Sequence, residues 1–478
     1  MSENVFALAA CYFNTAFSAS ALQTSAWLTF VCRFSVHSVT LCKISTVNRW
    51  ISLIAILFSG TTVVAQLRFS NINDILNYAD RHSTVARHGN LNRQVREEEV
   101  GLVRAGLLPK LNVFGTAEYA LILPTQVIPE SAFGGQDGKF RKVQFGMPLN
   151  FSSGVEFTLP LLNFEKWAQL EKAKLQSAET SWSQKALLES LHIQITQWYF
   201  QALVSKEMAR LNAENIQVVN ELMRILEERK RRGILEPADY NRSRNLQLNV
   251  EAAQRDYNKA WNECVINLRA LLNTPGAVSL ELTESIASFE WPVNDLNATI
   301  ISHRPAWNEA TARTEVAKQF LIESKKAALP KLSLSSRYLY NWQMNNAQNI
   351  HFDVSTVGVR LDYNLFNGGY HRRQQKKADL SLQSAYLQQQ QTESALIQQQ
   401  QEWWNNYTNA FSKKIILQDK VSIATDNLRI ARLNLKEGVM EFDAFNNIFS
   451  EYIRAQIEQL QNLSDGILYH LLITNNIK

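Results

Sequence analysis

The chain has 478 residues, of which 46% are hydrophobic and 19% charged, and this composition excludes an intrinsically disordered protein. Its formal net charge of +5, or +3 once residues 1–65 are left out, gives no reason to expect nucleic acid as a partner. Glycine (17) and proline (10) are scarce for this length, so we expect few turns and long elements between them.

The first 65 residues are predicted to be a leader. Lys43 and Arg49 precede the apolar run 50–58, and small residues at 63 and 65 allow cleavage before Gln66. This order is typical of a secretory signal peptide, and the run is too short to span a membrane. We expect residues 1–42 to reflect a misassigned start, with translation beginning near Lys43 at a non-AUG codon; ribosome mapping would test this. Three of the four cysteines lie in the leader, so no internal disulfide is expected.

The first half of the remaining chain is predicted to run helix, strand, strand, long helix, helix. The helix that stops before Pro109 precedes two strands, the second with apolar and polar residues alternating over 155–161. The loop between the strands carries turn signals at Gly134, Gly135 and Gly138. The long helix contains neither glycine nor proline and would extend about 100 Å at about 1.5 Å per residue. The predicted bounds are helix 72–107, strands 111–123 and 153–163, long helix 164–232 and helix 237–273.

The second half repeats this plan. Its predicted elements are helix 296–328, strands 332–343 and 352–366, long helix 371–437 and helix 442–474. Three segments recur in unchanged order, at offsets of 221, 204 and 205 residues: 108–113 as 329–334, 154–164 as 358–368, and 233–236 as 438–441. A duplicated unit follows. The predicted divisions are a leader 1–65, a first repeat 66–273, a linker 274–295 and a second repeat 296–478.

Both long helices carry apolar residues at alternating spacings of three and four. One series runs from Leu191 to Leu226 and the other from Trp403 to Leu435. This spacing is typical of coiled-coil packing, so the aromatic residues in it should be core rather than a cofactor site. In each repeat we expect the short helix before the strands to cover the near half of the long helix. The helix after the glycine should fold back along the far half.

The predicted strands are about ten residues long, the length that a tilted strand needs to cross a bilayer. Four strands cannot close a barrel, and an open sheet edge cannot face lipid, so several chains must share one barrel. The predicted fold is therefore mainly α with a membrane β-barrel part. Long coiled-coil helices form an α-barrel, and four strands per chain contribute to a trimeric 12-stranded barrel with an aqueous bore. Tyr338, Tyr340 and Trp342 fit an interfacial aromatic girdle, although burial within the barrel fits almost as well.

The leader, the duplicated order of elements and the strand-end motifs resemble the outer-membrane factor family, the TolC-like outer membrane efflux proteins. The resemblance covers about residues 68–475. It implies a homotrimer in the outer membrane of a Gram-negative-type cell, extending into the periplasm. It also implies export of drugs, metals or secreted proteins, together with a periplasmic adaptor (membrane fusion) protein and an inner-membrane pump.

Members of this family carry a Gly-Leu-type turn at each helical hairpin tip, where an adaptor docks. The matching positions here are Gly233, Ile234, Leu235, Gly438, Val439 and Met440. These glycines also fit a simple helix stop. Some members carry aspartates six and nine residues after the second glycine, where this chain has Ala444 and Asn447. Asp239, which matches the sixth position in the first repeat, and Glu441 and Asp443 are possible tunnel-entrance charges.

The sequence carries no pattern of catalytic chemistry. The eight histidines form no i, i+4 pair or Cys-paired spacing, and there is no phosphate-binding glycine loop and no nucleophile elbow. We therefore expect no enzyme and no cofactor, with any ATPase being a separate protein. The alternative is a periplasmic coiled-coil scaffold or adaptor-like protein without a pore, which would leave the two strand pairs unexplained. The sequence does not name the cargo.

Overall fold

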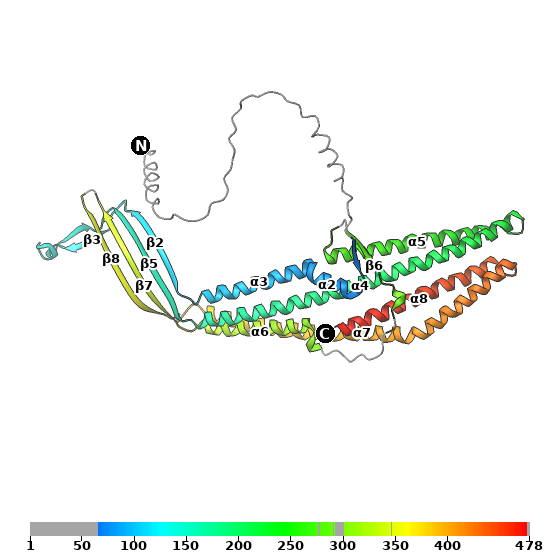
Figure 1. The fold of residues 1–478 in the computed structure, drawn as a ribbon. Coiled ribbons are helices and arrows are strands. Elements are labelled where there is room, and N and C mark those ends of the chain that lie inside the picture. The colour runs from blue at the N-terminus through cyan, green and yellow to red at the C-terminus, as the bar shows by residue number, and fades with distance from the viewer. Residues whose placement is uncertain (1–65, 276–277, 290, 292–300, 346, 476–478) are drawn as a thin grey trace, which may run out of the picture. The chain divides into compact units, whose positions relative to one another are not determined.

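The computed structural model describes residues 66–275, 278–289, 291, 301–345 and 347–475 (Figure 1). The predicted leader, with its signal peptide and its misassigned start, lies outside the described residues. None of the described helices is long and apolar enough to cross a membrane.

The first repeat contains the predicted helices and strands and three further short strands. Its elements are β1 (Gln66–Phe69), α2 (Ile72–His82), α3 (Thr84–Ala105), β2 (Lys110–Tyr119), β3 (Thr125–Pro129), η1 (Glu130–Phe133), β4 (Phe140–Gln144), β5 (Leu149–Leu162), α4 (Phe164–Arg231) and α5 (Pro237–Leu272).

The segment between the repeats and the second repeat follow. Their elements are β6 (Ser279–Leu282), η2 (Ile286–Ser288), η3 (Ile301–His303), α6 (Pro305–Lys326), β7 (Lys331–Met344), β8 (Asn349–Asp362), α7 (Tyr370–Glu437) and α8 (Phe442–Asn475).

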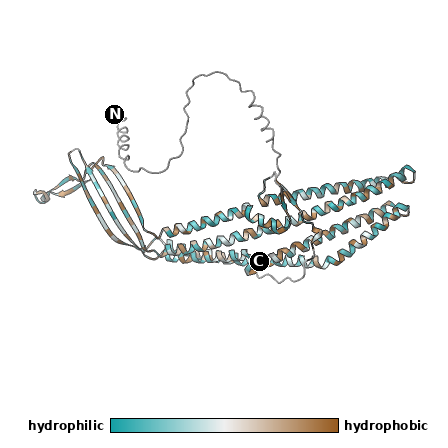
Figure 2. Ribbon diagram, viewed as in Figure 1, coloured by the Kyte–Doolittle hydropathy of each residue, from teal (hydrophilic) through white to brown (hydrophobic). Residues whose placement is uncertain are grey.

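The two long helices, α4 and α7, are each 68 residues long, as the lack of glycine and proline predicts. The shorter helices of the first repeat lie beside the two halves of α4, as the predicted helix lengths require. Asn90 of α3 accepts a hydrogen bond from Gln184 in the first half of α4, and Asn212 in the second half bonds the Val250 carbonyl of α5. Figure 2 shows hydrophilic and hydrophobic residues interleaved along these helices, as surface helices of a coiled coil require.

Two predicted helices begin or break elsewhere than expected. The helix predicted at 72–107 is divided at Ser83, whose extended ψ of 148° ends α2 and whose Oγ accepts the Ala86 N–H at 3.1 Å to cap α3. The helix predicted from 296 begins at Pro305 in the described residues, because Arg304 is extended and proline suits the first helical position. Residues 296–300 lie outside the described residues.

The four predicted strands form one antiparallel sheet in the order β2-β5-β7-β8. The loop expected between the first two strands contains the antiparallel pair β3 and β4, which the sequence analysis missed. A second missed pair is parallel: β1 joins β6 from the segment between the repeats. Each of these four strands has only four or five residues, too few for alternation to be recognised in the sequence.

The largest core surrounds the β1–β6 pair where the helices meet (Figure 1). Phe69, Leu282 and Ile286 pack there with Tyr199 of α4 and Leu268 of α5, and all are almost completely buried. The segment expected to be a linker thus supplies three apolar side chains to this core, including Leu280. A second core joins α4, α5, α7 and α8 near the hairpin tips.

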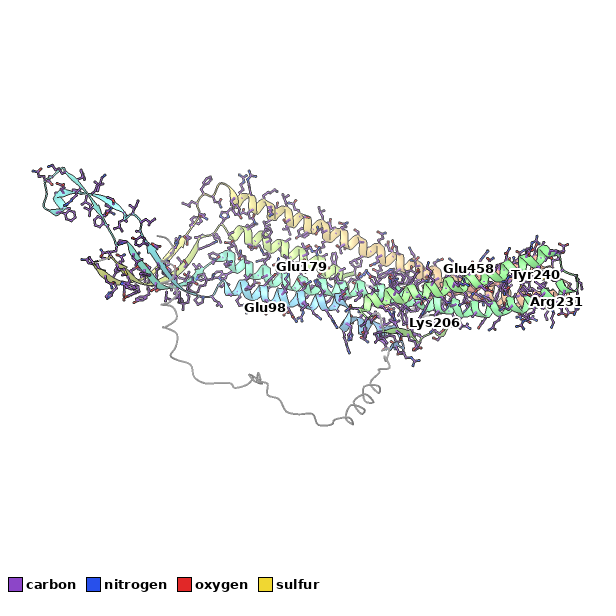
Figure 3. The ribbon with its side chains drawn as sticks, turned by 90° about the horizontal axis from the view of Figure 1, so that it is seen from above. Glu98, Glu179, Lys206, Arg231, Tyr240 and Glu458 are labelled. Atoms are coloured by element: carbon purple, nitrogen blue, oxygen red, sulfur yellow. The ribbon has the colours of Figure 1, made fainter. Side chains whose placement is uncertain are left out.

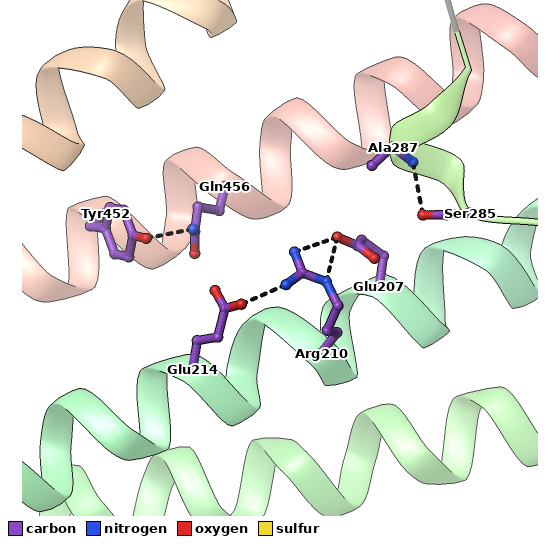
Figure 4. A network of polar contacts seen from close by, with 7 residues as sticks. All are labelled: Glu207, Arg210, Glu214, Ser285, Ala287, Tyr452 and Gln456. Atoms are coloured by element: carbon purple, nitrogen blue, oxygen red, sulfur yellow. Dashed lines mark hydrogen bonds and ion pairs between the residues drawn. The ribbon is translucent and has the colours of Figure 1, made fainter.

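A polar network lies on α4 and α8 between these cores (Figure 4). Arg210 donates to Glu207 and to Glu214 on its own helix, and Tyr452 accepts a hydrogen bond from Gln456 at 2.7 Å on α8. The hydrogen bond to Glu207 raises the pKa of the Arg210 guanidinium. Since Glu207 is almost fully buried, this bond is what stabilises its charge.

We expect Leu268→Ala to destabilise the chain by about 2–5 kcal/mol, because the fully buried side chain would leave a cavity in the larger core. Leu248→Ala on the same helix removes a half-exposed leucine and should cost no more than about 0.5 kcal/mol. Thermal unfolding followed by circular dichroism at 222 nm compares the two. Equal losses would contradict the assigned core.

Candidate membrane sheet and hairpin tips

The register of the four-stranded sheet places apolar side chains on one face. Strand residues alternate between faces, and cross-strand partners share a face, so one set of positions can be followed across all four strands. This set, the apolar face, contains Leu111, Val113, Ala117, Tyr119, Leu149, Phe151, Val155, Phe157, Leu159, Leu332, Leu334, Tyr338, Tyr340, Trp342, Met344, Val357, Val359 and Leu361. Many of these side chains are exposed in the chain, with Val113 at 79% and Val357 at 74%.

The opposite face of the sheet, the polar face, carries charged and hydrogen-bonding residues. Arg337 pairs with Glu156 at 3.1 Å, and Ser152 donates to Asn341 at 2.6 Å. A sheet with one apolar face and one charged face matches the wall of a membrane barrel with a polar interior. A sheet in water would bury its apolar face, and here no described element covers it.

Both edges of this sheet are unpaired among the described residues. β2 and β8 each pair with one neighbour only, and every residue of β8 is exposed. Their free N–H and C=O groups need partners, because an unpaired edge is costly in lipid and prone to aggregation in water.

The apolar face ends before the outer end of β8, the end farthest from the helices. There Ile350, Phe352 and Val354 lie on the polar face. Asp353 and Asn349 take the apolar-face positions; the Tyr338 hydroxyl donates to Asp353 at 2.8 Å and the Trp342 indole donates to Asn349. Aromatic side chains that combine an apolar body with such polar partners are typical of a membrane–water interface, which favours the girdle interpretation over burial.

At the end of the helices farthest from the sheet, two glycines close the helical hairpins in the same way. Gly233 has φ +74° and Gly438 has φ +81°, a left-handed conformation that residues with a Cβ adopt only at a cost. After each glycine, the next N–H returns to a helix carbonyl: Ile234 to Arg229 at 3.1 Å and Val439 to Asn434 at 2.9 Å. The duplicated sequence therefore produces two equivalent tips.

The six predicted tip residues divide into exposed and packed positions. Ile234 is 72% exposed and Val439 is 79% exposed, whereas Leu235 and Met440 are half-buried and pack against the tip core. Each tip thus presents one aliphatic side chain to its surroundings and uses its neighbour to hold the turn. Exposed apolar side chains at a rigid turn can contact a partner, but this arrangement alone does not name one.

Two arginines that the sequence analysis missed join the tips. Arg229, one turn before the first glycine, donates to the carbonyls of Leu435 at 2.6 Å and Lys436 at 3.2 Å, at the end of α7. Arg242 of α5 pairs with Asp443 of α8 at 2.7 Å. No local pattern reveals such contacts, because the partners lie 206 and 201 residues apart in the chain.

The possible tunnel-entrance charges are brought together in part. Arg242 contacts both Asp239, at 3.3 Å, and Asp443. Glu441 is exposed at the second tip. The guanidinium therefore offsets one of the two aspartates, and a role in ion selection stays a prediction.

Buried titratable groups elsewhere in the helical part serve packing. Burial, together with the hydrogen bond to Glu284, raises the pKa of Tyr199, and burial raises the pKa of the Cys264 thiol. Burial also lowers the pKa of His470, whose buried Nε2 has no hydrogen-bond partner in the part of the chain that the structure describes. Among the described residues there is no cluster of three metal-ligating side chains.

Comparison with known proteins agrees with this architecture. The family model described as "Outer membrane efflux protein" matches residues 87–274. The chain is 20% identical over 385 residues to the proteases secretion protein PrtF of Dickeya chrysanthemi, covering 76% of this chain and 79% of PrtF.

Two solved structures share the fold. The CmeC outer membrane channel of Campylobacter jejuni matches with a TM-score of 0.69 and 14% identity, over 85% of this chain and 86% of its own. The outer membrane protein VceC of Vibrio cholerae matches with a TM-score of 0.64 and 16% identity, over 85% of this chain and 95% of its own. The resemblance to TolC-like efflux proteins, the predicted fold class and the function as an outer-membrane export duct are confirmed. The matching family consists of transport proteins rather than enzymes.

We expect Arg229→Ala to loosen the second tip, because it removes two charge-assisted hydrogen bonds to the end of α7. One such bond contributes about 1.5–3 kcal/mol, so hydrogen exchange in peptides covering 434–441 should speed up by about tenfold or more. The matched control is Arg231→Ala, an exposed arginine without a hydrogen bond to a described residue. Unchanged exchange in Arg229→Ala would show that the two tips are not held by this residue.

Proposed function

We propose that this export duct is a homotrimer in the outer membrane, with twelve strands in the bilayer and helices that extend into the periplasm. There its hairpin tips meet a periplasmic adaptor and, through it, an inner-membrane pump. The observation that carries the proposal is the four-stranded sheet, which is apolar on one face, charged on the other and open at both edges.

The number of copies follows from the sheet. Pairing β8 of one copy with β2 of the next satisfies both edges and keeps the apolar face continuous around the barrel. Two copies would give eight strands, whose interior side chains would fill the barrel. Three copies give twelve strands, an even number with room for an aqueous bore.

The alternative hypothesis is a periplasmic scaffold without a pore, and the apolar face and open edges of the sheet argue against it. A scaffold in water would expose the whole apolar face and two edges of up to 14 residues. Both are aggregation hazards in solution and are satisfied in a lipid-embedded barrel.

The cargo class is proposed from the relatives. The name of PrtF states protease secretion, and VceC and CmeC are named as outer membrane proteins or channels. We therefore propose proteins as one class of cargo, and small molecules as the other class, which the sequence resemblance to efflux proteins implies.

We expect Val357→Lys to impair assembly and Thr356→Lys to be tolerated. The two residues are neighbours on β8, but Val357 lies on the apolar face and Thr356 on the polar face. A lysine facing the middle of the bilayer costs about 2–4 kcal/mol in a barrel, whereas one facing water inside does not. The measurement is the fraction of chain recovered from outer membranes as oligomer. Equal recovery of the two variants would remove the assignment of the lipid face.

The tips are tested by photo-cross-linking. A benzoylphenylalanine at position 234 or 439 should cross-link to a periplasmic adaptor in cells, because both native side chains are exposed at the turns. The matched control is position 121, where Leu121 is 90% exposed beyond the outer end of β2. Cross-links to the adaptor from position 121 but not from the tips would reverse the proposed orientation.

A further inference from the structure

The start of α7 carries an unusual set of charges. Four basic residues, Arg372, Arg373, Lys376 and Lys377, lie in its first two turns, its N-cap is Gly369 with no side chain to cap it, and its first turn has no acidic residue. A helix N-terminus is already positive, so basic residues there are destabilising.

The first repeat shows that the fold does not require this arrangement. The equivalent helix α4 has the same length, yet it begins with Asn163, whose side chain caps the Lys166 N–H at 3.0 Å, and with Glu165 in its first turn. The two helices start from equivalent strands, but the first two turns of α4 hold one cation, Lys166, whereas those of α7 hold four. The charge at the start of α7 is therefore a feature of this site and not of the duplicated architecture.

Three of these cations, Arg373, Lys376 and Lys377, line a groove of about 890 Å³ between α4, α6 and α7, the junction groove. Its charged lining consists of Lys172, Arg313, Arg373, Lys376 and Lys377, with Glu179 (labelled in Figure 3) as the single carboxylate. Its apolar lining includes Val316, Phe320 and Leu380.

Not all of the groove's cations are neutralised. Lys172 pairs with Glu323, Arg313 with Glu179 and Glu309, and Lys376 with Asp379. Arg373 and Lys377 are exposed and have no ion pair with any described residue. Two unpaired cations one helical turn apart, beside an apolar surface, fit a ligand with an anionic head and an apolar body.

The junction groove adjoins a hollow at the end of the polar face nearest the helices. Phe320 lines both the junction groove and an adjoining hollow of about 380 Å³, whose other residues include Lys331 and Asp362. Lys331 and Asp362 are cross-strand partners on the polar face. In the proposed duct, the polar face surrounds the bore, so the groove lies on the path of the cargo just below the membrane.

We propose that the junction groove is a binding site for amphipathic organic anions on the export path, with Arg373 and Lys377 holding the anionic head and Phe320, Val316 and Leu380 contacting the apolar body. The role of this groove in export rests on the proposed function, but all the residues that line it belong to one chain. Binding can therefore be measured whether or not the bore is as proposed.

The probe is decane-1-sulfonate below its critical micelle concentration, titrated calorimetrically into the mature full-length protein in amphipol. The groove variant is Arg373→Gln/Lys377→Gln, and it should bind the probe at least tenfold more weakly. The matched control is Arg372→Gln/Lys325→Gln, which removes two exposed cations outside the groove lining and should bind within twofold of the unmodified protein.

Two further ligands separate the contributions of head and tail. Methanesulfonate supplies the head alone and decyltrimethylammonium supplies the tail with the opposite charge, and both should bind at least tenfold more weakly than decane-1-sulfonate. Equal affinity of the groove and control variants would overturn the site. Equal affinity for decyltrimethylammonium or for methanesulfonate would overturn the ligand class. Trimers that form but do not bind the probe would contradict this inference without contradicting the proposed duct.

Discussion

The structure depends on one constraint: every backbone N–H and C=O of a strand in lipid must be paired within protein. A single chain cannot meet it, because its sheet ends at β2 on one side and at β8 on the other. The apolar face makes the constraint unavoidable, since this face is suited to lipid and would be costly in water. The proposed assembly with further copies therefore follows from the sheet itself and does not need a separate interface to explain it.

The positions of the long helices follow from the same arrangement of strands. Each strand pair leads directly into a long helix, so the proposed trimer would place three pairs of α4 and α7 around the continuing bore. At the far end the hairpins are joined within one chain by Arg229 and Arg242, which fix the tips to each other without fixing them to another copy. The junction groove lies between these regions, where the strand pairs pass into the helices.

Most of the fold could be predicted from the sequence because its signals are long. An unbroken stretch of at least 68 residues without glycine or proline defines α4 and α7, and the recurrence of the glycine turns defines the tips. Short or long-range features could not be predicted. Strands of four or five residues carry too little periodicity, and Ser83 divides a helix through a cap that resembles any other serine. The arginine contacts at the tips depend on partners about 200 residues away, and the cations of α7 gain meaning only when α4 and α6 are placed beside them.

The measurement that tests the central claim most directly is electron cryo-microscopy of the mature protein, purified from outer membranes in mild detergent. The account predicts a three-fold particle in which β8 of each copy pairs with β2 of the next, giving twelve strands around an open bore. The apolar face would point outward and the polar face inward. A monomer with both sheet edges free, or a closed barrel with another number of copies, would contradict it.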